Sequence, residues 1–491
     1  MKSKILLITL LFLGIESLVY SQNETDALRY SRTMFGGTAR FQGMGGAFGA
    51  LGGDFSTLSY NPAGIAIYRS SEFAFTPSFQ QDNTSSTYLK TNRDDFKYKL
   101  NLNNIGYVAT FNADRNSGWL GCNLGIGYNR FNTFNQNVVI EGNNDHSSMS
   151  DYFMDNANGT APENLNSYWE RLAFDTYVID TIPGETNQYQ TPVFYPVKQR
   201  KTISTKGSTG EWTFSFGANY NNVLYLGATF GIDKINYEEN VAYSEDDYKN
   251  VSPNFDYFDF KQYVETTGTG YTFKLGAIVK PTDFLRLGLA LHLPTFYDMK
   301  DEYDNNMASN LTGGKTVYPT DKDGNLLDKG SYDYSLTTPM RTIGSIALQI
   351  QKVAMLSLDC EYVDYTKMRL RDGGDGYDFG TENDNIKNMY KATANLHAGA
   401  EVKFGALALR GGYSYYGSPY KSDQLNKNSD YSVASAGFGI RQEKFFIDAA
   451  YNYGWNTEKG FLYNNSTLTN NDAFSSKLTT NKFIVTIGFR F

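Results

Sequence analysis

The chain is poor in cysteine, histidine, tryptophan and long apolar runs. Its 491 residues include 2 Cys, 3 His and 4 Trp. Two cysteines cannot build a disulfide framework, and three scattered histidines give neither a metal-ligand spacing nor a Ser/His/Asp grouping. After the N-terminus, no segment approaches the roughly 18 consecutive apolar residues that a transmembrane helix needs. We therefore expect no enzymatic activity, no metal site, no cofactor and no helical membrane span.

The charge balance and two glycine-rich stretches exclude further classes. The net charge is −8, so there is no basic surface for nucleic acid. No GxGxxG opens a helix after a strand, which excludes a nucleotide-binding fold. Residues 373–378 resemble one repeat of a calcium-binding array and residues 321–324 a fragment of an EF-hand. A single repeat cannot stack and the EF-hand glycine is misplaced, so both are predicted to be solvated turns.

The N-terminus has the pattern of an export signal. Lys2 and Lys4 precede an apolar run over 5–13, and Val19-Tyr20-Ser21 is a plausible cleavage site. We predict a signal peptide over residues 1–21. An exported chain without a membrane helix can be secreted, periplasmic or a β-barrel, since only helices and closed barrels satisfy their backbone groups in lipid.

What the chain does contain is tyrosine, phenylalanine, glycine and period-two alternation. There are 38 Tyr, 34 Phe and 46 Gly, against 12 Pro. Alternation is clearest at the C-terminus, where one face of a strand carries Phe483, Val485, Ile487, Phe489 and Phe491. Outer-membrane strands alternate in this way, and their aromatic residues gather at the two membrane interfaces. The composition therefore favours a transmembrane barrel, and Phe491 predicts recognition by the barrel-assembly machinery.

Alternation recurs often enough to count strands. We predict fourteen, an even number as single-chain outer-membrane barrels have. The predicted strands cover 70–81, 98–112, 119–135, 208–221, 222–242, 261–280, 284–300, 332–351, 353–369, 390–404, 406–417, 430–442, 444–457 and 477–491. Tight turns alternate with long polar loops at about 141–207, 244–259, 301–331 and 371–389. Short turns are typical of the periplasmic rim and long loops of the extracellular one.

The charged residues of these strands share one face. Arg286, Asp359, Glu361, Arg410 and Asp448 all oppose the apolar set. A soluble sandwich or propeller would expose a polar outer face, whereas a Lys or Arg at the lipid midplane costs about 2–4 kcal/mol, so the confinement favours an all-β transmembrane antiparallel barrel over 70–491. Cys122 and Cys360 lie on apolar faces and are predicted to be free, lipid-facing residues.

The segment between signal and first strand, 22–69, does not alternate. It is dense in glycine and has too few large apolar residues for a core of its own. A fourteen-stranded barrel is wider than its own side chains fill. The segment is therefore expected to pack inside the lumen as a plug.

Several segments resemble the FadL/TodX family of outer-membrane transporters for long-chain fatty acids and other hydrophobic compounds. The N-terminal segment resembles the hatch of that family, and Asn61, Pro62 and Ala63 match its Asn-Pro-Ala signature. The resembling hatch segments are 27–31 (ALRYS), 39–47 (ARFQGMGGA) and 59–64 (SYNPAG), and those of the strands are 292–297, 336–341 and 410–414. The most specific part of this resemblance is the order of the short motifs together with the count of fourteen strands.

The resemblance implies passive uptake across the outer membrane of a Gram-negative bacterium. A hydrophobic substrate binds in the lumen, and it leaves sideways into the lipid when the hatch moves beside a kinked strand. A fatty chain gains about 0.8 kcal/mol per buried CH₂, which an aqueous pore would forfeit. A barrel that acts as a scaffold or adhesin through its extracellular loops, above all 141–207, is the alternative. We expect a monomer whose partners are hydrophobic small molecules and outer-membrane lipid.

Three groups of residues are candidates for the site. Asn61, Pro62, Ala63 and Gly64, with Arg40 and Asp54, form the predicted hatch or gate. Asn61-Pro62 also suits a simple turn, and Arg40 and Asp54 also suit structural anchoring.

The other two groups lie on predicted strands. Arg341, Arg410 and His292 face the lumen and are candidate contacts for a substrate carboxylate, or members of a salt-bridge lattice. Alternation breaks between Arg130 and Phe134, where Phe131 and Phe134 no longer share a face. This predicts either the strand kink or an ordinary twist.

Overall fold

The protein is described by a computed structural model that covers residues 23–34, 36–113, 118–351, 353–463 and 472–491. The predicted signal peptide, 1–21, lies outside these ranges. Within them, no helix has both the length and the apolar character to cross a membrane.

The strands form one closed antiparallel sheet, because β1 pairs with β2 on one side and with the last strand, β21, on the other. The described residues give fourteen barrel strands, four of them interrupted, as the sequence predicts. They are β1 (Glu72–Tyr88), β2 (Thr91–Asn112), β3 (Trp119–Thr133) with β4 (Gln136–Asn144), β7 (Val197–Tyr220), β8 (Leu224–Asp246), β9 (Tyr257–Val279), β10 (Leu285–His292) with β11 (Phe296–Ser309), β13 (Gly330–Thr337) with β14 (Arg341–Ile350), β15 (Ala354–Asp364) with β16 (Arg369–Asp372), β17 (Ala392–Phe404), β18 (Leu407–Tyr416), β19 (Tyr431–Arg441), β20 (Phe445–Gly460) and β21 (Phe474–Arg490).

The two faces of the strands are as predicted. Phe214 and Phe216 on β7 are exposed, whereas Thr213 and Ser215 between them are buried. The alternating aromatic and aliphatic residues of β21 are likewise exposed up to Phe491. Cys122 and Cys360 are free, as predicted. An apolar outer face with a polar interior is what a barrel in lipid requires.

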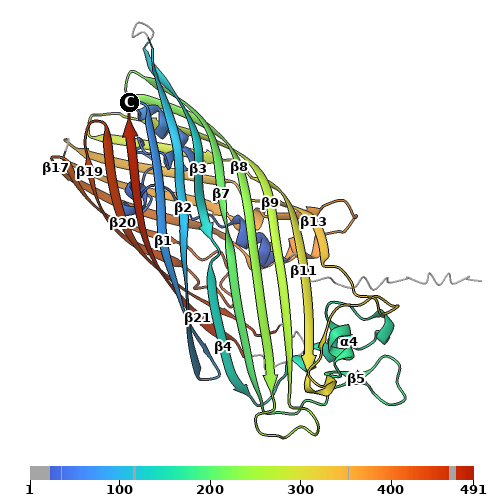
Figure 1. The fold of residues 1–491 in the computed structure, drawn as a ribbon. Coiled ribbons are helices and arrows are strands. Elements are labelled where there is room, and N and C mark those ends of the chain that lie inside the picture. Colours follow the sequence, from blue (N-terminus) through green and yellow to red (C-terminus); the bar gives the residue numbers. More distant parts are fainter. Residues whose placement is uncertain (1–22, 35, 114–117, 352, 464–471) are drawn as a thin grey trace, which may run out of the picture.

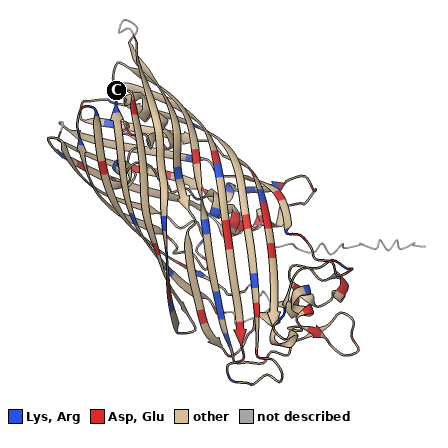
Figure 2. Ribbon diagram, in the orientation of Figure 1, with Lys and Arg blue, Asp and Glu red and all other residues tan. Residues whose placement is uncertain are grey.

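Several strands are longer than the alternation indicated. β1 and β2 meet at a turn over 89–90, whereas predicted strands end at 81 and begin at 98. The loop predicted at 141–207 is shorter, 145–196, and that at 301–331 is reduced by β11, which continues to Ser309. These strand ends project beyond the lipid and carry charge on both faces, so hydrophobic alternation does not mark them. Figure 2 shows charged residues along the loop-end half of β7, β8, β9 and β11.

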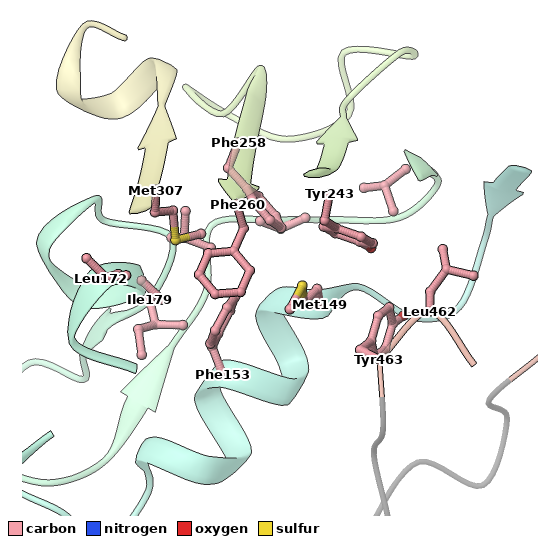
Figure 3. Close-up of a cluster of buried hydrophobic side chains, with 14 of the residues drawn as sticks. Met149, Phe153, Leu172, Ile179, Tyr243, Phe258, Phe260, Met307, Leu462 and Tyr463 are labelled. Carbon is pink, nitrogen blue, oxygen red and sulfur yellow. The ribbon is translucent and has the colours of Figure 1, made fainter. Parts of the chain in front are cut away.

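Residues 145–196 fold into a compact unit, which we call the extracellular cap. It contains α4 (Met149–Ala157), α5 (Glu170–Asp175) and the short pair β5 (Asp180–Thr181) and β6 (Tyr189–Gln190), and it lies at the end of the barrel opposite the C-terminus (Figure 1). Phe153 and Leu172 of the cap pack against Phe258 and Phe260 of β9 (Figure 3). The predicted loop is therefore an ordered element that shares a hydrophobic core with the barrel.

Glu245, near the end of β8, connects this cap to the barrel. Its carboxylate accepts hydrogen bonds from the backbone N–H of Met149 (2.7 Å), from Gln199 Nε2 (2.9 Å) and from the hydroxyls of Ser148 and Tyr243. A strand needs about 9–11 residues to span lipid, so Glu245, 21 residues after Leu224, lies well outside the membrane. Full burial is the main influence on this group, and it raises the pKa of Glu245 to about 7.

We expect the attachment of the cap to weaken as pH rises. Because the folded-state pKa is raised, protonated Glu245 is favoured in the folded cap, and its contribution is complete below the ordinary pKa and lost as pH rises through about 7. The expected change between pH 4.5 and 8 is about 3 kcal/mol. Hydrogen exchange of α4 across this range would measure it. Glu245→Gln should remove the pH dependence, and an unchanged profile in that variant would contradict the assignment to Glu245.

Candidate functional site: the hatch and the lumen cavity

The N-terminal segment lies inside the barrel, as expected for a plug (Figure 1). Its elements are α1 (Glu24–Ser31), α2 (Ala39–Gly43), α3 (Thr57–Tyr60) and the 3₁₀ helix η1 (Pro62–Ile67). Every residue of α3 is buried, although the segment has little apolar bulk. Short capped helices and turns therefore satisfy its backbone, and the barrel wall supplies the surface against which it packs.

Asn61 is the cap of η1, and its side chain holds two parts of the hatch together. Its Oδ1 accepts from the backbone N–H of Ala63 (3.1 Å), and its Nδ2 donates to the carbonyl of Gly49 (2.5 Å). Pro62 begins the 3₁₀ helix, where its missing N–H costs nothing. A side chain at Gly276 of β9 would collide with Asn61, since an added Cβ lies 2.0 Å from its Oδ1. Glycine in the barrel wall thus allows this turn to approach the strand backbone.

Arg40 ties the hatch to a buried ionic lattice on the wall. Its Nε and Nη2 bind the two oxygens of Glu401 on β17, at 3.0 and 3.2 Å. Glu401 also binds Arg410 Nε (2.6 Å), and Arg410 Nη1 contacts Asp448 (2.7 Å), which in turn binds Arg441 (2.6 Å). The side chains of Glu401, Arg410 and Asp448 are fully buried. Such a chain of alternating charges is stable only while every member keeps its partners.

The other predicted site residues are also engaged with the hatch. Asp54 accepts both from Thr38 Oγ1 (2.8 Å) and from the backbone N–H of Ser56 (3.0 Å). Arg341 binds Glu361 (2.6 Å) and the carbonyl of Ser31. The contacts of Asp54 thus stabilise a turn within the hatch, and those of Arg341 attach the hatch to β14.

His292 completes this set, because its Nε2 bonds to the carbonyl of Tyr60 at 2.8 Å. Arg341, Arg410 and His292 thus meet hatch or wall atoms, and none of them lines the large cavity described below. Their contact with substrate stays a prediction.

Residues 32–34 and 36 of the hatch lie along β3 at the predicted irregularity, and Phe35 lies outside the described residues. The N–H of Gly36 donates to the carbonyl of Arg130 (3.1 Å), and that of Met34 donates to Asn132 Oδ1 (2.8 Å). Asn132 Nδ2 donates back to the carbonyl of Arg32 (2.5 Å). We call this segment the strap. It connects the hatch to the irregularity of β3 between Arg130 and Asn132.

β3 is disrupted where the alternation failed. Its register with β7 shifts between Arg130 and Asn132, and the strand ends at Thr133 before β4 resumes at Gln136. The ladder between β2 and β3 runs from Asn112↔Gly121 only as far as Asn104↔Asn129.

Beyond that point the described residues show no backbone pairing between β2 and either β3 or β4. Side chains cross instead, such as Arg130 Nε to the carbonyl of Leu102 (2.9 Å). Beside Phe131 and Phe134, the described part of the barrel wall therefore lacks the backbone hydrogen bonds that would join β2 to its neighbour.

A cavity of about 480 Å³ occupies the lumen between the hatch and the extracellular end. Hatch residues Leu28 and Phe41 line it, and so do Phe131 and Phe134 of the disrupted β3–β4 junction. Its size is within the range of small-molecule sites. The cavity thus adjoins the gap between β2 and β3 and contacts the hatch, so that a bound molecule would touch both.

Sequence reasoning missed three features of this site. The partner of Arg40, Glu401, lies 361 residues away, and nothing local marks the pairing. The strap has no pattern of its own. His397, seen only as a residue facing the lumen, lines the cavity and binds the carbonyl of Gly45 through Nδ1 (2.9 Å). The sequence indicated only that His397 lies on the inner face of its strand, and this was the one signal that could have pointed to its place in the cavity.

Comparison with known proteins identifies the family. The sequence model of the family described as outer membrane protein transport protein (OMPP1/FadL/TodX) matches residues 209–491, more than half of the chain. The chain belongs to this family. Its members are outer-membrane transport proteins rather than enzymes, and the family includes transporters of hydrophobic compounds. Membership places the barrel in the Gram-negative outer membrane, as the sequence predicted.

Solved FadL/TodX structures share the whole architecture, hatch included. A FadL homologue of Pseudomonas aeruginosa is 16% identical, with 94% of this chain and 99% of that chain covered and a TM-score of 0.56. The toluene transporter TodX of P. putida is 14% identical, with 93% and 99% covered and a TM-score of 0.53. At these identities the likeness establishes the fold. No curated protein sequence matches the chain.

Proposed function

We propose that this member of the FadL/TodX family is a passive channel for hydrophobic small molecules such as long-chain fatty acids. The substrate binds in the lumen cavity and leaves sideways between β2 and β3 when the hatch moves. The observation that carries the proposal is the meeting of three features at one place: the cavity, the unpaired stretch of β3 and the strap that joins this stretch to the hatch.

The physical order of events follows from these contacts. A molecule entering the cavity meets Phe131 and Phe134 beside the strap. Displacing the strap breaks three hydrogen bonds, each worth about 0.5–1.5 kcal/mol, which burial of a few CH₂ groups offsets. With the strap withdrawn, only side chains cross the gap. Lateral release keeps the hydrocarbon chain of the substrate out of water throughout.

The proposal predicts that the purified protein retains a fatty acid. Native mass spectrometry of the full-length barrel with added oleate should give a one-to-one complex. Asn61→Ala removes both hatch contacts of this side chain and should reduce the retained fraction severalfold. A barrel that stays empty with oleate, and with an alkylbenzene as second probe, would contradict the proposal and favour a scaffold acting through the cap.

A further inference from the structure

The lumen cavity has an apolar wall and a polar wall. Hatch residues and the elements from β3 to β7 supply the mainly apolar side, where Asn135 and other polar residues accompany Leu28, Phe41, Phe131, Phe134, Val138 and Ile203. The polar side is made by consecutive strands from β17 to β1. On it, His397, Ser414, Val433, Gly454, Thr480 and Asp82 form one cross-strand row. In this row Ser414 already donates to the carbonyl of Gly45 (2.7 Å) and Thr480 to Asp82 (2.6 Å), so the atom left without a partner among the described residues is His397 Nε2.

Several polar atoms of the cavity wall lack hydrogen-bond partners among the described residues, although they are buried. They belong to His397 (Nε2), Asn456 (Oδ1), Asn135 (Oδ1 and Nδ2), Ser435 (Oγ) and Asn452 (Oδ1). The side chains of His397 and Asn135 are only 2% and 3% exposed. An unsatisfied buried polar atom costs about 1–3 kcal/mol, so each one calls for a partner.

The partners that these atoms need are mostly donors. His397 Nδ1 faces a carbonyl, so it must carry the proton, and its Nε2 is left as an acceptor. Asn456 Nδ2 donates to Glu458 Oε1 (3.2 Å), which leaves the Oδ1 of Asn456 as an acceptor. Both oxygens of Asp82, also on this wall, already accept from Thr480 and Gln80. Asn452 Nδ2 donates to Gln42 Oε1 (2.8 Å), which leaves the Oδ1 of Asn452 as a further acceptor. A carboxylate head on the ligand has no hydrogen to donate to any of them.

The charges around the cavity do not favour an anion either. Arg29 is paired with Asp26, and Arg32 lies 3.8 Å from Glu458. Lys482 follows Thr480, the partner of Asp82, along β21 and therefore lies near that carboxylate. Lys459 and Glu239 also line the cavity, so side chains of both signs surround it in similar number, and the hydrogen-bonding pattern decides the head group.

We infer that the cavity selects an uncharged amphiphile whose head carries several hydroxyl groups, of the type represented by a monoacylglycerol. The acyl chain lies against the apolar wall and the gap beside β3, while the two hydroxyls of the head meet Ser435 Oγ and Asn452 Oδ1, which lie directly opposite each other on β19 and β20. This inference rests on the proposed function, because it names the substrate class of the same cavity.

The test compares two ligands with the same chain. The full-length protein in an amine-oxide detergent, which has no hydroxyl group, is given equimolar 1-monoolein and oleate, and native mass spectrometry measures the ratio retained. We expect monoolein to be preferred about tenfold. Ser435→Ala and Asn452→Leu should each reduce this preference to near unity. Asn236→Leu, the same change on the outer face of β8, is the matched control and should keep it.

Each result has a defined meaning. Equal retention, or a preference for oleate, would overturn the inference while leaving lumen binding, and so the proposed function, intact. Retention of neither ligand would overturn both. A preference that survives Ser435→Ala and Asn452→Leu would also overturn the assignment to this wall. Should Asn452→Leu fail to fold because it also loses the hydrogen bond to Gln42, Ser435→Ala alone decides, since the Ser435 hydroxyl has no hydrogen-bond partner to lose among the described residues.

Discussion

Glu401→Gln is expected to destabilise the barrel by about 3–5 kcal/mol and to detach the hatch from the wall. The substitution keeps the shape of the side chain but removes the charge that both Arg40 and Arg410 face. Arg410 is fully buried, so its guanidinium cannot recover the loss from water. Urea unfolding monitored by tryptophan fluorescence would measure the stability, and proteolysis of the hatch would report its release.

A matched control separates burial from charge. Glu302→Gln makes the same chemical change in the exposed pair with Lys300 (2.6 Å). Exposed ion pairs contribute little, so this variant should unfold at the same urea concentration as the wild type. Equal behaviour of the two variants would mean that the lattice around Glu401 does not hold the hatch.

Locking the strap to β3 is expected to abolish uptake. Met34→Cys with Asn132→Cys, in a chain whose Cys122 and Cys360 are replaced by alanine, puts cysteines at two neighbouring positions, since the backbone N–H of Met34 lies 2.8 Å from Asn132 Oδ1. A disulfide would prevent the strap from leaving the gap while the cavity stays intact. Uptake of labelled oleate should fall to the level of cells without the barrel, and a reductant should restore it.

The single variant Met34→Cys in the same background controls for loss of the side chain. It should transport with and without reductant. If the oxidised double variant transports at the rate of the reduced one, substrate does not need the strap to move, and release beside β3 is excluded. Oleate retained by the locked form in native mass spectrometry would show that binding and release are separate steps.

The strands were predictable because lipid imposes a strict rule on them. Any residue on the outer face meets hydrocarbon, so every outward position from Phe483 to Phe491 is apolar, and fourteen such patterns could be counted. The ends of β8 and β11 were not predictable to the same extent, because outside the membrane both faces of a strand tolerate charge. The disruption at Arg130–Phe134 could be located from the sequence, since its alternation fails there.

The candidate site was only partly predictable. Asn61 and Pro62 were identified from a short motif whose local turn is the same in any context, and the structure has that turn. Arg40 was expected to need a buried partner, but Glu401 could not be named because 361 residues separate them. Pairing across the lumen depends on barrel closure and register, which bring β17 opposite α2.

The sequence by itself determined the barrel, its strand number, its lipid-facing residues and the presence of a glycine-rich plug, because each follows from a local periodicity or composition that the membrane enforces. Only the tertiary structure decided which charges pair, that the strap lies on β3 where the ladder to β2 ends, and that unpartnered polar atoms of β17 and β20 face the cavity beside it. These are relations between segments distant in sequence, and they exist only once the sheet has closed around the hatch.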